Sequence, residues 1–310
     1  MQKVLKLILA GLILTTYSIL SLANKEQPPD LELINIPPGQ FVSLDSHWVH
    51  LHCIGWGEVT VLFEAGLGGS SLEWQPIQQQ LARRTRACVY DRAGYGWSDP
   101  SPFPRHARQL ALETGMLLDA SGIQGSLILV GHSFGGFVIR ELAALSGPEI
   151  IGMVLIDSSH EDQLVRLETA GGRAVMPTGG NFVISAIEIP EYQPRDAHRK
   201  LQVLSQMRKN RAATRAEMSM FRLSAEQVRL NRSMVDYPVV VLSRGLDLYP
   251  VDARGTRKNA ICQELQQDLI GLSSRGRMVR ALKSGHHIHV DEPELVTRSI
   301  ESILNEYEKN

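Results

Sequence analysis

The chain has 310 residues, of which 32 are basic and 33 acidic, and 43% are hydrophobic. These proportions exclude a disordered chain, because such chains have too little apolar surface to offset the entropy lost on ordering. The formal net charge of −1 argues against a nucleic-acid partner, which calls for a basic excess to neutralise phosphates. One long apolar run is present, at the N-terminus, so a multi-span membrane protein is excluded as well.

The N-terminal segment has the pattern of a targeting sequence. Two lysines precede an apolar run, and the small residues Ser21 and Ala23 stand at positions −3 and −1 of a possible cleavage site. This order predicts a secretory signal peptide over residues 1–23 and a secreted or periplasmic mature protein over residues 24–310. The alternative is a membrane anchor over residues 7–22, since the stretch approaches membrane-spanning length.

Short apolar runs alternate with longer amphipathic stretches through most of the chain. Strands are predicted over 41–44, 48–53, 59–63, 87–90, 127–130, 150–156, 238–242 and 278–282, and helices over 72–83, 106–120, 134–145, 259–272 and 294–308. Apolar strands separated by helices favour an α/β fold with a parallel sheet covered on both faces. Such sheets carry their chemistry on the loops at the carboxyl ends of the strands.

The alternation breaks over residues 159–234, which contain helical pieces and no convincing strand. A long insertion in a compact domain is usually a lid or a binding element, so we expect a lid and no second domain. Residues 195–232 carry ten basic and three acidic side chains. We expect a solvated helical face there, and the alternatives are peripheral contact with an anionic membrane or with an acidic substrate.

A serine between glycines follows the strand predicted over 127–130. The segment from Gly131 to Gly135 has the pattern G-x-S-x-G, and a predicted helix comes directly after it. In that context the turn lifts the serine hydroxyl above the sheet, and the helix N-terminus stabilises negative charge near it. The context predicts Ser133 as a nucleophile, and the alternative is an ordinary glycine-rich turn.

A nucleophilic serine needs a base, and the base needs a carboxylate to orient it. His286 follows the last predicted strand and Asp247 follows the strand before it, so the chain order is serine, acid, histidine. This order predicts His286 as the base and Asp247 as the acid. Asp252 in the same loop and Asp157 after the preceding strand compete for the role of the acid.

Two further histidines, His287 and His289, follow His286. A metal site is the alternative reading of these three residues, but no carboxylate or cysteine stands at a supporting spacing, so we expect no metal.

The oxyanion formed during acyl transfer also needs hydrogen-bond donors. One is the backbone N–H after the nucleophile, at Phe134, and the second comes from the loop after the third strand. That loop, residues 64–71, contains three glycines, and we expect the N–H of Leu67 to be the donor. A phosphate-binding loop is the weaker alternative, because no lysine follows the glycines and no G-x-G-x-x-G spacing occurs.

Four segments of the chain together resemble the α/β-hydrolase superfamily. They are Gly66–Ser71 with Trp74, Tyr90–Ser98, Gly131–Gly136, and Ser284–His286 with Asp291 and Pro293. The resemblance covers about residues 40–308 and is to single-domain, lidded, esterase-like members. It implies a mostly parallel, doubly wound sheet of eight strands with an inserted helical lid over 159–234.

The resemblance also implies roles for single residues. It implies Ser133, Asp247 and His286 as a catalytic triad, with Leu67 and Phe134 as the oxyanion donors. The family histidine follows a glycine directly, which favours His286 over its neighbours.

Two further positions of the resemblance concern the loops. Asp91 and Arg92 lie in a family motif that is usually structural, and we expect them to form an ion pair that holds their loop. Ala65 stands where a histidine is commoner in the family. This difference changes the side chains that support the oxyanion loop, but it does not remove the backbone N–H donor.

The sequence therefore predicts a serine hydrolase that cleaves an ester or related acyl bond of a small-molecule substrate, with no metal or organic cofactor. Ser133 argues against dehalogenases and epoxide hydrolases of the superfamily, whose nucleophile is an aspartate. Lactone, amide and carbon–carbon bond hydrolysis and a cofactor-free haloperoxidase-like activity stay open, as does a non-catalytic binding protein on the same fold. Met218 or Phe221 is expected to line an acyl pocket under the lid.

Three cysteines are present, Cys53, Cys88 and Cys262. The resemblance places the second and fourth strands side by side, and Cys53 and Cys88 lie on these strands, so we expect a disulfide between them if the register allows. Export would supply the oxidising compartment. The alternative is two buried free thiols, and Cys262 is expected to be free in either case.

Overall fold

The computed structural model describes residues 31–145, 147–171 and 195–309. The chain divides into two compact units, Met1–Leu31 and Glu32–Asn310, and the second contains all the strands and α-helices of the described residues. The predicted signal peptide over residues 1–23, or anchor over 7–22, lies outside the described residues. No helix in the described ranges is both long enough and apolar enough to span a membrane.

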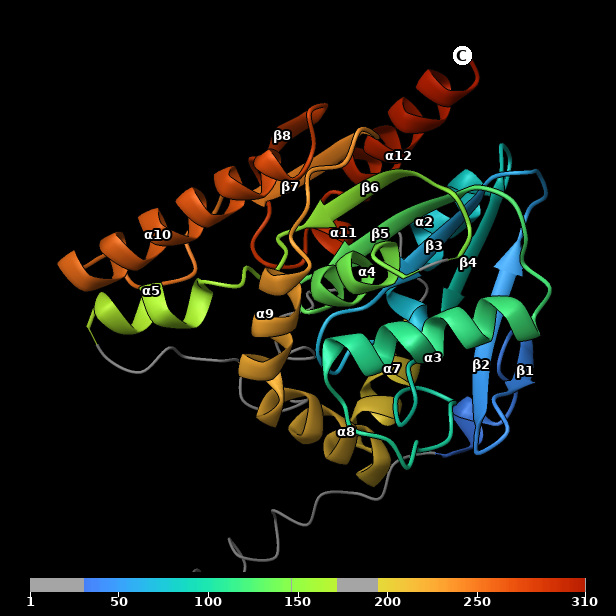
Figure 1. Ribbon diagram of the computed structural model, residues 1–310. Coiled ribbons are helices and arrows are strands. Elements are labelled where there is room, and N and C mark those ends of the chain that lie inside the picture. Colours follow the sequence, from blue (N-terminus) through green and yellow to red (C-terminus); the bar gives the residue numbers. More distant parts are fainter. Residues whose placement is uncertain (1–30, 146, 172–194, 310) are drawn as a thin grey trace, which may run out of the picture. The chain divides into compact units, whose positions relative to one another are not determined.

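Eight strands form one sheet in the order β1-β2-β4-β3-β5-β6-β7-β8 (Figure 1). They are β1 (Gln40–Ser43), β2 (Trp48–Ile54), β3 (Thr60–Glu64), β4 (Arg86–Tyr90), β5 (Leu127–His132), β6 (Ile150–Ile156), β7 (Val239–Arg244) and β8 (Gly276–Ala281). Strand β2 runs antiparallel to β1 and β4, and all other neighbouring strands are parallel. The fold class predicted from the resemblance is thereby confirmed.

Helices cover both faces of the sheet because successive side chains of a buried strand point to opposite sides. In β5, Leu127 and Leu129 join one core and Ile128 and Val130 join the other. The first core includes α3 (Ala107–Ala120), α4 (Gly135–Ala143) and α9 (Phe221–Leu230), and the second includes α2 (Gln75–Leu81), α11 (Ile288–Asp291) and α12 (Pro293–Tyr307). The central strands β3 and β5 are buried along their whole length.

The described elements also include three short 3₁₀ helices and one long helix. They are η1 (Leu31–Ile34), η2 (Ser71–Trp74), η3 (Ile270–Leu272) and α10 (Ala253–Leu269). Helix α10 begins six residues before the predicted start at 259, because the side chain of Asp252 caps it by accepting from the N–H of Gly255 at 2.7 Å. This cap gives Asp252 a structural role in place of the catalytic one considered from the sequence.

The inserted segment lies between β6 and β7 and is helical where the structure describes it. It contains α5 (Gln163–Thr169), α7 (Arg195–Gln206), α8 (Arg208–Ser219) and α9. Residues 172–194 of the predicted lid lie outside the described residues. Helix α9 belongs to the core of the domain, since Phe221 and Val228 are buried against α3 and α4.

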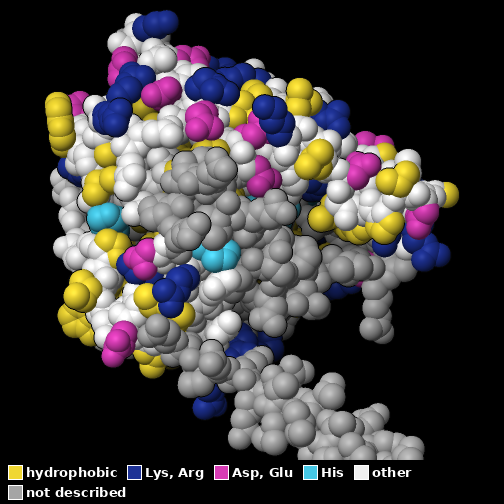
Figure 2. Space-filling view, turned by 180° about the vertical axis from the view of Figure 1, so that it is seen from behind, with side chains coloured by type: hydrophobic (Ala, Val, Ile, Leu, Met, Phe, Trp, Pro, Cys, Tyr) yellow, Lys and Arg dark blue, Asp and Glu magenta, His cyan; other side chains and the backbone are white. Residues whose placement is uncertain are grey.

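Several basic side chains of residues 195–232 are neutralised within the domain. Ion pairs join Lys200 to Asp196, Arg222 to Glu168, Arg229 to Asp162, and Arg232 to Glu161 and Asp268. On the face drawn in Figure 2, basic and acidic side chains of the described residues are intermixed. The pairs made by Lys200, Arg222 and Arg229 are at least partly exposed and contribute about 0–1 kcal/mol each to stability, whereas Glu161 in the Arg232 pair is buried. Contact of this segment with a membrane stays a prediction.

Cys53 and Cys88 are direct neighbours in the register of β2 and β4 and form a disulfide. Cys262, on α10, is the free cysteine. Both expectations about the cysteines are confirmed.

Candidate active site

Ser133 occupies the sharp turn between β5 and α4. Its φ angle is 52°, in the left-handed region, which for a non-glycine residue costs about 1–3 kcal/mol. The turn is held because the N–H of Ser133 donates to Ile156 O at 3.0 Å and the N–H of Gly136 donates to Ser133 O at 3.0 Å. A side chain at Gly135 would come within 2.6 Å of the backbone oxygen of Ala65, so only glycine fits there. The sequence-predicted turn geometry is present.

His286 is oriented by Asp157. Nδ1 of His286 donates to Oδ2 of Asp157 at 2.6 Å, and Asp157 is buried at the carboxyl end of β6 with a φ angle of 38°. Since an ionised carboxylate only accepts hydrogen bonds, the proton lies on Nδ1, and Nε2 is left as the basic nitrogen.

The hydrogen bond that we expected from Asp247 is therefore made by Asp157, which corrects the assignment of the acid. Asp247 is exposed in the loop after β7. The N–H groups of Gly245 and Leu246, just before it, donate to Ser284 O at 3.2 and 3.0 Å and tie that loop to the one after β8. Among the contacts of the described residues, none joins Asp247 to His286.

Arg244, the last residue of β7, was not predicted from the sequence and neutralises Asp157. Its Nη1 lies 2.5 Å from Oδ2 of Asp157, and both side chains are buried. Burial alone would raise the pKa of Asp157, but the charge of Arg244 and the hydrogen bond from His286 lower it below its usual value. Asp157 is consequently ionised over the pH range of most enzymes and can stabilise an imidazolium at His286.

The loop after β3 lies directly against the nucleophile. A Cβ at Gly66 would stand 2.9 Å from Nδ1 of His132 and 3.3 Å from Cβ of Ser133, so glycine permits this close approach. Outside the bonds within helices and strands, no backbone hydrogen bond of the described residues uses the N–H of Leu67 or of Phe134. Both N–H groups are available to an oxyanion beside Ser133.

One pocket brings these residues together. The described residues that line it are Leu67, Ser133, Asp157, Ser158, Ser159, Gln163, Leu167, Phe221, Arg244, Leu248, Tyr249, Cys262, Leu265, Gln266 and His286. Phe221 lines the pocket as expected, whereas Met218 is not among these residues. No hydrogen bond between Ser133 and His286 occurs in the described contacts, and such bonds often form only with substrate bound. The mixed wall suits an acyl group with some polar contacts.

A group of buried histidines supports His286. The ring of His132 lies 4.7, 5.3 and 4.4 Å from the rings of His286, His287 and His289, and its Nε2 donates to His286 O at 2.9 Å. Burial, followed by repulsion among the histidines, lowers the pKa of His132 and of His287. Within the described ranges, no group of three or more His, Cys, Asp or Glu side chains is arranged to hold a metal ion.

Asp91 and Arg92 do not pair with each other, which corrects our expectation. Asp91 Oδ2 accepts from Nδ1 of His50 at 2.8 Å, while Arg92 pairs with Glu64 and, at 2.8 Å, with Glu217 of α8. Both residues lie in the loop after β4, and each binds a different part of the domain.

Comparisons with known proteins point to one family. A model of the Alpha/beta hydrolase family matches residues 61–298. The uncharacterized protein YqjL of Bacillus subtilis is 31% identical over 254 residues, which cover 80% of this chain and 85% of YqjL.

Two solved structures are similar in fold. A thermophilic esterase from Thermogutta terrifontis aligns with a TM-score of 0.62 at 19% identity, over 86% of this chain and 98% of the esterase. A structure described as a membrane phospholipase A, a bacterial virulence factor, aligns with a TM-score of 0.66 at 18% identity, over 98% of this chain and all of that chain. At these identities the likenesses establish the fold alone.

Proposed function

Because the chain belongs to the alpha/beta hydrolase family, we propose that it is a serine hydrolase that cleaves an ester or related acyl bond of a small-molecule substrate. The main support for this proposal is the hydrogen bond between His286 and Asp157, together with the residues that surround it. The bond from His286 to Asp157 leaves the basic nitrogen of His286 in the same pocket as Ser133 and the unoccupied N–H of Leu67. These are the parts that acyl transfer through a serine requires.

In the proposed mechanism Ser133 Oγ attacks the carbonyl carbon while Nε2 of His286 takes its proton. Asp157 holds the imidazole in the required tautomer and stabilises the imidazolium. The N–H groups of Leu67 and Phe134 donate to the tetrahedral oxyanion. His286 then protonates the leaving alcohol, and water activated by His286 hydrolyses the acyl-enzyme. No step needs a metal or an organic cofactor.

Ester cleavage is the first choice among the possible bonds. The nucleophile is a serine, which speaks against the aspartate-based chemistry of dehalogenases and epoxide hydrolases. The apolar side of the pocket, with Leu167, Phe221 and Leu265, suits an acyl chain.

Labelling with a fluorophosphonate probe tests the proposal. The wild-type protein should be labelled, Ser133→Ala should not, and Ser159→Ala should be labelled, because Ser159 lines the same pocket without the strained turn. A wild-type protein that resists the probe would favour a non-catalytic binding protein. A screen of esters from acetyl to dodecanoyl, with lactone and amide analogues beside them, then identifies the bond class and the acyl length.

We also propose that the protein is exported, with cleavage after Ala23. The Cys53–Cys88 disulfide supports export, because structural disulfides persist in oxidising compartments. Sequencing the N-terminus of protein from the periplasm or the medium tests this proposal. An N-terminus at Asn24 supports cleavage, whereas a full-length chain in the membrane fraction supports an anchor over residues 7–22.

The inserted segment, residues 159–234, is proposed to act as a lid over Ser133 and to touch membranes from its outer side. Phe221 in the pocket wall supports the first part. Binding to anionic vesicles at low salt that weakens at high salt would support the second part, and binding that ignores lipid charge would contradict it.

A further inference from the structure

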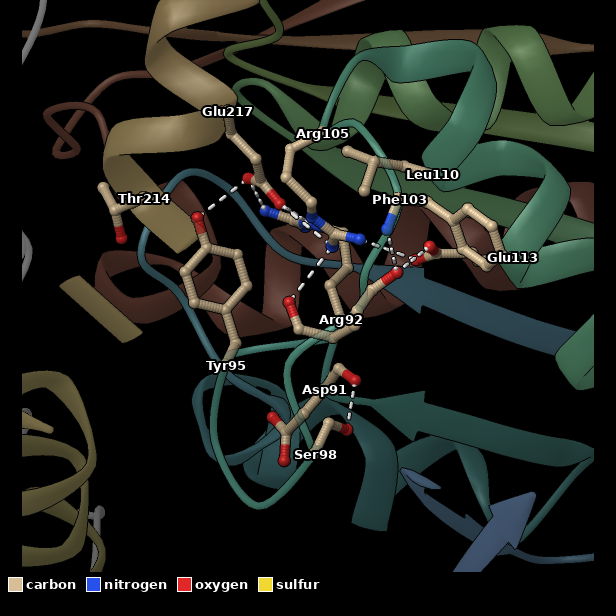
Figure 3. Close-up of polar contacts among 12 residues, drawn as sticks. Asp91, Arg92, Tyr95, Ser98, Phe103, Arg105, Leu110, Glu113, Thr214 and Glu217 are labelled. Carbon is tan, nitrogen blue, oxygen red and sulfur yellow. Dashed lines mark hydrogen bonds and ion pairs between the residues drawn. The ribbon is translucent and has the colours of Figure 1, made fainter. Parts of the chain in front are cut away.

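Arg92 connects the loop after β3, which contains Leu67, to helix α8 of the inserted segment. Figure 3 shows the contact of Arg92 with Glu217 of α8. Arg92 lies after β4 and is 4% exposed, and Glu217 lies on α8 and is fully buried. Nε and Nη2 of Arg92 donate to the two carboxylate oxygens of Glu217 at 3.0 and 2.8 Å. A bidentate pair of this kind fixes the plane of the guanidinium as well as its position.

The other N–H groups of Arg92 hold the oxyanion loop. Nη2 also donates to Gly66 O at 2.8 Å, and Nη1 donates to Ala65 O at 2.6 Å and to the carboxylate of Glu64. A guanidinium has five N–H donors, so two are engaged by Glu217 and three by the loop. The position of Arg92 is therefore set jointly by the inserted helix and by the loop.

The hydrogen bond from Arg92 to Gly66 O also determines where the N–H of Leu67 points, because both groups belong to one peptide plane. No described peptide bond is cis, and in a trans peptide the C=O of Gly66 and the N–H of Leu67 point in opposite directions. Arg92 and the N–H of Gly69, at 3.3 Å, both bind Gly66 O. With the oxygen held toward Arg92, the N–H of Leu67 faces away from it. Rotation of this one peptide plane would remove the donor.

We propose that Glu217 and Arg92 are positioning residues for the oxyanion hole: Glu217 fixes Arg92, and Arg92 fixes the peptide plane that presents the N–H of Leu67. This inference rests on the proposed function, because the orientation of that N–H matters only if it stabilises an oxyanion. Neither side chain is among the described residues that line the pocket. Helix α8 thus supports the reaction without touching the substrate.

The test compares two isosteric variants within one buried network. Glu217→Gln leaves one acceptor oxygen in place of two, so one N–H of Arg92 loses its partner. Glu113→Gln is the matched control, because Glu113 pairs with Arg105 at 2.7 Å and has no contact with the oxyanion loop among the described contacts (Figure 3). Glu217→Gln removes the charge that faces Arg92 and, at 3.5 Å, Arg105, and Glu113→Gln removes the charge that faces Arg105 alone. Both variants therefore disturb Arg105, and Glu217→Gln alone also disturbs Arg92. The measurements are kcat and KM for an ester, the rate of fluorophosphonate labelling, and the urea midpoint.

Glu217→Gln should lower kcat and the labelling rate about 10- to 100-fold, short of the full loss of a donor, with KM changed less than about threefold. Glu113→Gln should keep kcat within about threefold of wild type. The inference is overturned if Glu217→Gln keeps the wild-type kcat, or if both variants lose kcat equally. In either case, labelling of the wild-type protein still supports the proposed function. A wild-type protein that is neither labelled nor active overturns both.

Glu217→Asp covers the case in which Glu217→Gln does not fold. It keeps the carboxylate but shortens its reach, so the ion pair persists while the bidentate geometry is lost. A loss of kcat without a change in KM supports the positioning role, and wild-type kcat overturns it.

Discussion

Nδ1 of His286 lies 2.6 Å from Oδ2 of Asp157, although 129 positions separate the two residues in the chain. They meet because Asp157 directly follows β6, which is the neighbour of the strand that leads to Ser133, and His286 follows β8 at the same edge of the sheet. Arg244, at the end of the intervening strand β7, contacts the same carboxylate oxygen. The acid of the proposed triad thus lies one strand nearer to Ser133 than the loop that holds Asp247.

Asp157→Asn should lower kcat about 10⁴-fold, because an asparagine stabilises the wrong imidazole tautomer. It should also lower the urea midpoint, because it leaves the buried Arg244 without its counter-charge, so kcat is compared under conditions in which the variant is folded. Asp247→Asn is the matched control and should keep kcat near the wild-type value, since Asp247 is exposed. Steady-state kinetics on one ester compares the three proteins. A large loss in Asp247→Asn with little loss in Asp157→Asn would restore the assignment made from the sequence.

The sequence was sufficient to predict that Ser133 and His286 lie together, but not which carboxylate binds His286. Ser133 lies in a short motif whose local context defines the turn, and His286 follows a strand and a glycine. Asp157 and Asp247 both follow buried strands, so chain order could not separate them. The deciding feature is the backbone of Asp157, whose φ of 38° turns the carboxylate toward His286 in a way that no local pattern specifies.

Arg244→Gln should reduce the free energy of unfolding by about 3–5 kcal/mol near neutral pH, because it leaves a buried carboxylate without its counter-charge. Arg257→Gln on α10 is the control, since Arg257 is exposed. The folded-state pKa of Asp157 lies below its unfolded value, so its contribution is present above about pH 4 and is lost as the pH falls through the folded pKa. The difference in the free energy of unfolding between the two variants, measured by urea unfolding, should therefore become smaller in acid. A difference that does not change with pH would contradict this role of Asp157.

The buried histidines predict a loss of stability in mild acid. The pKa of His132 and of His287 is lowered by burial, so below about pH 6.5 the unfolded chain takes up protons that the folded chain resists. Each such proton lowers the free energy of unfolding by up to about 1.4 kcal/mol per pH unit. The raised pKa of His50, which is paired with Asp91, acts in the opposite direction.

Urea unfolding of His287→Gln isolates one of these groups. Its free energy of unfolding should fall less steeply than that of the wild type between about pH 6.5 and 5, and the two slopes should agree above about pH 7. Equal slopes in acid would show that His287 does not resist protonation in the folded protein.

Contacts between side chains far apart in the sequence could not be predicted from local sequence patterns. The strands were predictable because their apolar runs are buried on both faces, and the order of motifs implied the sheet. Arg92 illustrates the limit, because its neighbour Asp91 suggested an ion pair, whereas its partner Glu217 lies 125 residues away on α8. Such a contact depends on how the inserted helices pack on the sheet.

The disulfide between Cys53 and Cys88 is expected to stabilise the folded protein. Cys53 and Cys88 enclose a separation of 35 residues, for which the chain-entropy model gives about 3–4 kcal/mol of stability. Reduction should lower the free energy of unfolding by that amount, measured by urea unfolding with and without reductant. Cys262→Ala should show the same difference, because Cys262 is free. A thiol assay on the denatured, unreduced wild type should detect one thiol, and a count of three would mean that neighbouring cysteines on β2 and β4 remain reduced in the protein as isolated.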